Sequence, residues 1–174
     1  MTQRCTKLEE AVTTPVLSAK TEMPVYAISE QLVMAGQPQP QDWSQLAADG
    51  FDLVINIRSD PQRAAVQAER ARQAGLDYAH LPVPAYELEG PHLDEFNRLM
   101  TTALAERRKV LLHCRTASRT ALLWLLKRQV HDGWTQAQAE AELAAAGYTD
   151  DDMEVFQFCS EDFFERCVVP EAPL

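Results

Sequence analysis

The chain alternates short apolar runs with longer segments in which apolar residues recur at helical spacing. Short apolar runs that are bounded by Gly, Pro or charged residues are typical of β-strands. The longest of these runs is nearly continuous, as expected for a strand that is covered on both faces. Five strands are predicted, over Val25–Ile28, Leu32–Ala35, Phe51–Ile57, Tyr78–Val83 and Lys109–His113.

The longer segments predict helices, and several of them carry capping residues at their ends. Asp60 and Pro61 form an N-cap and first-turn pair for a helix that stops at Gly75. The segment Thr120–Val130 is apolar all round in its first half, which is typical of a buried helix. Further helices are predicted from Pro40 or Asp42 to Gly50, over Leu93–Arg107, from Thr135 to Ala146, and after Thr149.

This alternation of strands and helices predicts a single α/β domain. Its expected core is a central, mostly parallel sheet with helices on both faces. We assign residues 23–174 to this domain, with an acidic helical segment at the C-terminal end. Residues 1–22 are polar and lack periodicity, so we expect a flexible N-terminal arm there.

The most informative segment is the end of the last predicted strand and the turn that follows it. Cys114 comes directly after this strand, and a predicted helix begins beyond Arg119. A cysteine at a helix N-terminus is favoured as a thiolate, because the helix dipole and free backbone N–H groups stabilise negative charge. The same N–H groups, together with Arg119, form a cradle for a tetrahedral anion. The segment therefore predicts the site of a cysteine-based phosphatase or of a sulfurtransferase.

The neighbours of Cys114 take supporting roles in this prediction. The hydroxyl of Thr120 is expected to donate to the Cys114 sulfur and to help it leave when a thiol adduct breaks down. His113 faces the opposite side of the strand, so it is expected to position the loop or to be a satisfied core histidine. The expected anion-binding residues are Arg115, Thr116, Ala117, Ser118 and Arg119.

Composition and charge narrow the classes of function. The chain is 46% hydrophobic and 24% charged, which is ordinary for a globular protein. Its net charge of −10 lies in residues 129–174, which hold one basic and 11 acidic side chains. Nucleic acid is therefore not an expected partner, because its binding relies on Lys and Arg. The acidic segment is expected to be a solvated helical surface.

Membrane and disulfide signals are absent from the sequence. No apolar run approaches the length of a membrane span, and Met1–Lys20 lacks the apolar core of a secretory signal. The four scattered cysteines show neither a disulfide framework nor zinc spacing. We therefore expect a cytoplasmic protein that uses no metal and no cofactor and does not bind membranes.

Three segments resemble a known family of bacterial proteins. They are a Gly-Gln-Pro turn in Ala35–Pro40, a strand ending in Asn-hydrophobic-Arg in Gly50–Arg58, and the Cys-Arg loop in His113–Thr120. Over about residues 24–147 the chain is similar to the phosphatase-like domain of β-lactamase-hydrolase-like proteins. The resemblance implies a dual-specificity-phosphatase fold and either phosphatase-like or sulfurtransferase-like activity.

Two features of the loop depart from the phosphatase pattern that this resemblance implies. Protein tyrosine phosphatases place five residues between Cys and Arg, whereas four separate Cys114 from Arg119, as in many rhodanese loops. The usual loop glycine is Ala117 here. If that position requires a positive φ, alanine carries a steric cost there.

The resemblance also implies a general acid on the loop that follows the preceding strand, where related phosphatases carry an Asp. The corresponding loop, Pro84–Gly90, has no Asp, so Glu87 or Glu89 is the expected acid. Asp60 is a third candidate, although the cap of a helix is the better interpretation of that residue.

Three hypotheses follow, in order of preference. The first is a phosphatase-like hydrolase that forms a thiophosphate on Cys114 and acts on a phosphorylated small molecule or a phosphoprotein. The second is a sulfurtransferase that takes sulfur from a sulfane-sulfur donor as a persulfide on Cys114, a reaction that needs no general acid. The third is a non-catalytic anion-binding module.

Overall fold

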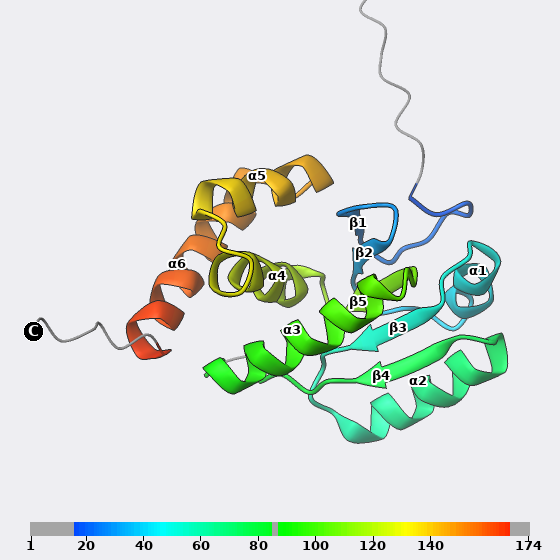
Figure 1. Ribbon diagram of the computed structural model, residues 1–174. Helices are drawn as coiled ribbons and strands as arrows, with labels where there is room; N and C mark the ends of the chain where they lie inside the picture. The colour runs from blue at the N-terminus through cyan, green and yellow to red at the C-terminus, as the bar shows by residue number, and fades with distance from the viewer. Residues whose placement is uncertain (1–15, 85–86, 168–174) are drawn as a thin grey trace, which may run out of the picture.

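The computed structural model describes residues 16–84 and 87–167, which form a five-stranded sheet with helices around it (Figure 1). The strand order is β1-β2-β5-β3-β4. β2, β5, β3 and β4 are parallel to their neighbours, and β1 is an antiparallel edge strand. The predicted mostly parallel sheet is therefore confirmed. The strands are β1 (Val25–Ala27), β2 (Leu32–Ala35), β3 (Leu53–Asn56), β4 (Asp77–His80) and β5 (Val110–His113).

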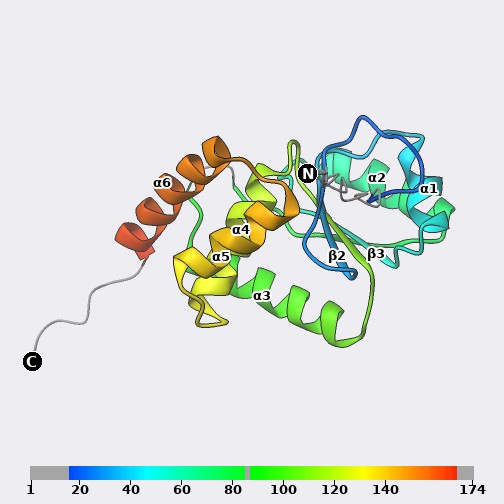
Figure 2. The same cartoon turned by 90° about the horizontal axis from the view of Figure 1, so that it is seen from above.

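Helices cover both faces of the sheet, as predicted (Figure 2). On one face, α1 and α2 pack against alternate sheet residues such as Val54 and Leu111. On the other face, α3 and α4 pack against the intervening residues such as Ile55 and Leu112, and α5 and α6 pack on α4. The helices are α1 (Asp42–Ala48), α2 (Pro61–Ala74), α3 (Gly90–Ala105), α4 (Ser118–Val130), α5 (Gln136–Ala146) and α6 (Asp150–Cys167).

The packed domain reaches further toward the N-terminus than the boundary expected at residue 23. Residues 1–15 of the expected arm lie outside the described residues. In the remaining part, Leu17 is buried in the core beneath α1 and α2. Ser18 also donates its hydroxyl and its backbone N–H to the Asp49 carboxylate. Sequence periodicity misses this segment because a single buried side chain leaves no repeating pattern.

The predicted helix ends of α2 are confirmed, whereas the strand before α3 is shorter than predicted. Asp60 caps α2, and Gly75 ends it in the left-handed conformation at φ 83°. β4 ends at His80, yet Leu81 and Val83 still donate their N–H groups to Asn56 and Ile57. Pro82 between them has no N–H, so the regular ladder cannot continue through it. The chain nevertheless follows β3 to the edge of the sheet where the Cys114 turn lies.

Candidate functional site

The β5–α4 turn is a strand-to-helix connection whose helix has no side-chain cap. Cys114 follows β5 directly, and Ala117 occupies the N-cap position of α4. Ala117 has φ 69°, in the left-handed region that the sequence analysis identified as costly for alanine. Within residues 16–84 and 87–167, the backbone N–H groups of Arg115 and Thr116, and those of Ser118 to Thr120 in the first turn of α4, donate to no protein acceptor. A run of open N–H groups at a helix N-terminus is a site suited to an anion.

The end of β2 lies against this turn and fixes its position. The backbone N–H of Gln37 donates to the carbonyl of Arg115 at 3.1 Å, and Gly36 pairs with Thr116. A Cβ on Gly36 would lie 2.7 Å from Pro24 Cδ and 2.9 Å from the Arg115 oxygen. Only glycine allows this close approach, which explains the Gly-Gln-Pro turn noted in the sequence.

Two hydroxyl groups hold the carbonyl of Ala117 from beneath. Thr120 Oγ1 donates to this oxygen at 2.8 Å, and the Tyr148 hydroxyl donates to it at 2.7 Å. Burial raises the pKa of Tyr148 well above its usual value, so this hydroxyl stays a donor. The expected bond from Thr120 to the Cys114 sulfur is therefore replaced by one to Ala117. Thr120 has a single hydroxyl proton, and the left-handed turn leaves the Ala117 carbonyl as its acceptor.

His113 is buried under the turn and holds it from the strand side. Its Nδ1 donates to the carbonyl of Cys114 at 3.1 Å, since a carbonyl oxygen can only accept. Burial lowers the pKa of His113 from 6.5 to about 4, so the ring is neutral at physiological pH. These contacts support the expected positioning role and leave His113 without a link to the Cys114 side chain.

Arginine side chains gather around the turn. Arg119 Nη1 donates to the carbonyl of Val83 at 3.2 Å, and Arg58 Nη1 donates to Gln37 Oε1 at 2.7 Å. Burial lowers the pKa of Arg58, and the nearby cations Arg63, Arg115 and Arg119 lower it further. Arg115 is exposed. Several arginines gathered at one open turn create a positive potential that attracts an anion.

Cys114 lies at the base of this arrangement. Its side chain is only 2% exposed and belongs to the core cluster on the α3–α4 side of the sheet. Burial alone would fit a structural thiol. The turn beside it combines open N–H groups with arginines, which is the environment that stabilises a thiolate.

The three candidate acids lie in different surroundings. Asp60 Oδ1 accepts the N–H groups of Gln62 at 2.9 Å and Arg63 at 3.2 Å, so its interpretation as a helix cap is confirmed. Glu87 has φ 65° and lies in a hollow against α6, where Arg166 donates to the carbonyl of Leu88. Glu89 precedes α3 and donates its N–H to the His92 ring. In the part of the chain that the structure describes, no hydrogen bond or ion pair joins Glu87 or Glu89 to the Cys114 turn.

Two further kinds of site were searched for in the described residues. They contain no cluster of three or more His, Cys, Asp or Glu side chains that could hold a metal ion. None of their helices combines the length and the apolar character that crossing a bilayer requires.

A comparison with known families agrees with the resemblance carried by the three sequence motifs. The family model described as "Beta-lactamase hydrolase-like protein, phosphatase-like domain" matches residues 25–131. The chain belongs to this family. The match spans β1 to the end of α4, so this phosphatase-like domain includes the Gly36 turn, Arg58 and the whole Cys114 loop.

Curated relatives of this phosphatase-like domain are longer proteins. A beta-lactamase hydrolase-like protein of Xylella fastidiosa (strain Temecula1) is 29% identical over 131 residues, which cover 72% of this chain and 30% of the relative. A protein of the same name from Agrobacterium fabrum is 30% identical over 109 residues, covering 60% of this chain and 25% of the relative. The chain thus spans less than a third of the length of these relatives.

Solved structures share the fold of the phosphatase-like domain. A candidate phosphatase from Neisseria meningitidis matches with a TM-score of 0.63 and 26% identity, covering 75% of this chain and 94% of that one. TpbA of P. aeruginosa matches with a TM-score of 0.65 and 22% identity, covering 84% and 88%. These matches confirm the predicted dual-specificity-phosphatase-like fold.

Sequence reasoning located the Cys114 loop but gave no role to the residues that surround it. Arg58 and Gln37 were noted only as parts of motifs, and Tyr148 was not singled out. All three come to the loop from distant parts of the chain. The one local signal was the Asn-hydrophobic-Arg motif, whose Asn56 accepts the Arg58 N–H at 2.8 Å and shapes the turn that presents Arg58.

Proposed function

We propose that this phosphatase-like domain hydrolyses a phosphate monoester through Cys114. The Cys114 thiolate attacks phosphorus while the bond from phosphorus to the leaving-group oxygen breaks. Arg119 and the N–H groups of the loop hold the phosphoryl oxygens. Water then attacks the thiophosphate, the S–P bond breaks, and inorganic phosphate and the thiolate are released.

The observation that carries this proposal is the set of open N–H groups on Arg115, Thr116 and the first turn of α4, directly beside a cysteine. A structural thiol needs no such surroundings, and an α-helix normally has its first N–H groups satisfied by a capping side chain. The arginine cluster around the loop supports the same proposal, because Arg58 is close enough to Arg63, Arg115 and Arg119 for its pKa to fall.

A phosphorylated substrate is supported by one of the structural matches. TpbA of P. aeruginosa carrying a Cys-to-Ser substitution has been solved in complex with phosphotyrosine, and it covers 90% of this chain at a TM-score of 0.64 and 20% identity. We carry over only the class of ligand, a phosphate monoester, and not the amino acid that bears it.

Glu87 or Glu89 is proposed as the group that protonates the leaving oxygen. Both belong to the segment that begins at Val83. The Val83 carbonyl accepts a hydrogen bond from the Arg119 guanidinium. This contact joins the start of the segment to the anion site. Glu87 also has a positive φ, a conformation that non-glycine residues adopt mostly at constrained and functional positions.

A second candidate function is sulfur transfer, and the length of the loop favours it. Four residues separate Cys114 from Arg119, as in many rhodanese loops, and within the described residues the candidate acids form no hydrogen bond or ion pair with the loop. In this reaction the thiolate attacks the outer sulfur of thiosulfate, the S–S bond breaks and sulfite leaves. Cyanide then takes the sulfur as thiocyanate and restores the thiolate.

The two functions are separated by one set of assays. Purified wild type, Cys114→Ser and Arg119→Ala are each given an aryl phosphate, and separately thiosulfate with cyanide. Phosphate release that depends on Cys114 supports the first proposal. Thiocyanate formation without phosphate release from any aryl phosphate or phosphopeptide overturns the first and supports the second. Release of neither product overturns both.

A further inference from the structure

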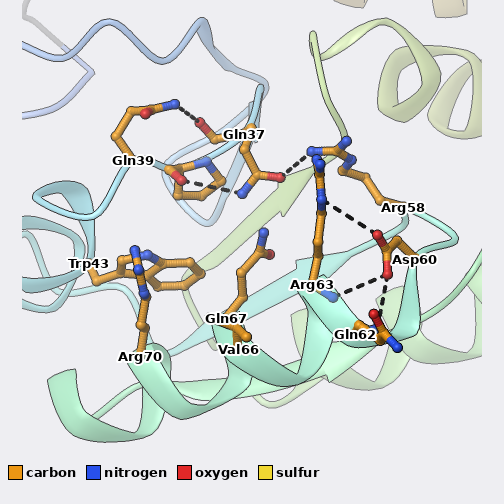
Figure 3. Close-up of a pocket in the computed structure, with 11 residues that line it drawn as sticks. Gln37, Gln39, Trp43, Arg58, Asp60, Gln62, Arg63, Val66, Gln67 and Arg70 are labelled. Carbon is orange, nitrogen blue, oxygen red and sulfur yellow. Dashed lines mark hydrogen bonds and ion pairs between the residues drawn. The ribbon is translucent and has the colours of Figure 1, made fainter.

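A pocket of about 610 Å³ opens beside the Cys114 loop, between the chain that follows β2 and helix α2 (Figure 3). Its volume lies within the range of small-molecule sites, which are concave and hold most of a ligand's surface. Trp43 forms a rigid part of its wall, being only 3% exposed, and Val66, which is 56% exposed, supplies apolar surface. Gln37, Gln62 and Gln67 supply polar groups.

The pocket carries more positive than negative charge. Arg58, Arg63 and Arg70 line it, and Asp60 is its one carboxylate among the described residues. Asp60 is already engaged, because it caps α2 and forms an ion pair with Arg63 at 3.5 Å. Among the described residues, no carboxylate lies within ion-pair distance of Arg58 or Arg70. These two cations are therefore available to an anion.

The pocket is continuous with the Cys114 loop through two residues. Arg58 lines the pocket and is near enough to Arg115 and Arg119 for their charges to lower its pKa. Gln37 accepts from the Arg58 guanidinium with its side chain and donates its backbone N–H to Arg115. In Figure 3, Arg58 and Arg63 extend toward the same end of the pocket, whereas Arg70 lies at the other end beside Trp43.

We propose that this pocket is a second anion subsite, which binds the second phosphate or carboxylate of a small substrate whose first phosphate occupies the Cys114 loop. The proposal rests on the proposed phosphatase function and names its substrate class as small molecules with two anionic groups. The carbon skeleton between the two groups lies along Val66, and Arg70, beside Trp43, holds the distal anion. A concave pocket with a buried aromatic wall fits such a molecule better than an extended phosphopeptide.

The test uses the full chain with Cys114→Ser, which cannot turn over substrate, so binding is measured apart from hydrolysis. Isothermal titration calorimetry compares n-alkyl monophosphates with α,ω-alkanediol bisphosphates of the same chain length, over a series of lengths. We expect the best bisphosphate to bind at least about tenfold tighter than its matched monophosphate, a difference of about 1.4 kcal/mol, because it gains hydrogen bonds to a charged group.

Two variants assign this gain to the pocket. Arg70→Gln should reduce the affinity ratio between bisphosphate and monophosphate toward one, whereas Cys114→Ser alone keeps it. The matched control is Arg72→Gln on the same helix, whose guanidinium pairs with Glu69 outside the pocket, and this variant should keep the full ratio. Thermal melting of each variant checks that it is folded.

The outcomes separate this proposal from the function on which it rests. Equal affinity for both ligand classes in the unmodified pocket overturns the subsite, as does a ratio that survives Arg70→Gln. A phosphotyrosine peptide with a neighbouring Glu that gains as much from Arg70 overturns the small-molecule assignment. A wild type that hydrolyses no phosphate ester, with the bisphosphate preference intact, overturns the proposed hydrolysis and supports the subsite.

Discussion

Two strand-to-helix turns lie side by side at the same edge of the sheet, and they treat their helix N-termini in opposite ways. The β3–α2 turn carries Asp60, whose carboxylate accepts two N–H groups of α2. The β5–α4 turn carries Ala117 in a left-handed conformation and offers no capping side chain. The first turn neutralises its helix end with its own carboxylate, whereas the second leaves its helix end open.

This contrast shows how one topology can give both a structural turn and a candidate active site. Both turns follow buried parallel strands, and both helix dipoles favour a negative charge at the same edge. At Asp60 the protein supplies that charge. At the Cys114 turn, no carboxylate of the described residues forms a hydrogen bond or an ion pair, so its N–H groups stay open to an added anion.

The residues that precede the turns repeat the contrast. Asn56 on β3 and His113 on β5 are paired in register, and both are buried. The Asn56 side chain forms hydrogen bonds with three residues, which are Arg58, Tyr78 and Gln67. His113 binds the Cys114 carbonyl, and within the described residues its Nε2 has no partner. The residue that precedes the uncapped β5–α4 turn thus has fewer side-chain hydrogen bonds than the residue that precedes the capped β3–α2 turn.

Removing charge from the open turn should have the largest effect. We expect Arg119→Ala to lower kcat/KM for an aryl phosphate by about a hundredfold, because a fixed donor to the developing charge is lost. Arg119→Lys should recover part of the activity, since it restores the charge without the planar fork. The control is Arg98→Ala, an exposed arginine on α3 that pairs with Glu95. Full activity in Arg119→Ala would show that the open turn does not hold the substrate.

The buried His113 beneath the uncapped β5–α4 turn should make the free energy of unfolding depend on pH. The pKa of His113 is lowered by burial to about 4 from 6.5 when unfolded. The contribution of neutral His113 to the free energy of unfolding is therefore fully present above pH 6.5. It is lost as the pH falls toward 4, because the unfolded chain binds the proton more tightly. Between neutral pH and about pH 5 this amounts to about 2 kcal/mol.

Urea unfolding of wild type and His113→Gln at the two pH values checks this dependence. The variant should be less stable at neutral pH but should lose less on acidification than wild type. An identical loss in both proteins would show that other groups cause the acid sensitivity.

Removing the cap from the β3–α2 turn should destabilise the fold without changing the β5–α4 turn. Asp60→Ala leaves two N–H groups of α2 without their acceptor, so we expect the free energy of unfolding to fall by about 1 kcal/mol. Asp60→Asn keeps a capping oxygen and should fall much less. Chemical denaturation of the three proteins gives the comparison, and equal stability of wild type and Asp60→Ala would refute the capping role.

The smallest expected effect has the opposite sign. Ala117→Gly removes the steric cost of φ 69° and should raise the free energy of unfolding by about 0.5 kcal/mol, after the loss of a buried methyl group is included. The matched control, Ala137→Gly on the exposed side of α5, should lower it by about 1 kcal/mol. If both substitutions destabilise equally, the left-handed alanine carries no strain.

Local patterns predicted the elements of this fold because their signals are short-range. Each of these signals lies within one turn or strand, as with the Asp60–Pro61 pair, the Gly75 stop and the apolar run before Cys114. The surroundings of the loop depend instead on register: Ala35 and Asn56 both pair with His113, which brings the ends of β2, β5 and β3 together. Arg58, Gln37 and Tyr148 therefore meet at the loop through long-range contacts that no local pattern encodes.

If the uncapped β5–α4 turn holds an anion against a nucleophilic Cys114, this cysteine must carry the phosphoryl group during turnover. Rapid-quench mass spectrometry of the peptide that contains Cys114, after mixing with an aryl phosphate, detects that intermediate. We predict an adduct with the mass of one phosphoryl group on Cys114 in wild type, which is absent in Cys114→Ser. Phosphate release that persists in Cys114→Ser, or a Cys114 that gains a single sulfur from thiosulfate and never a phosphoryl group, would contradict it.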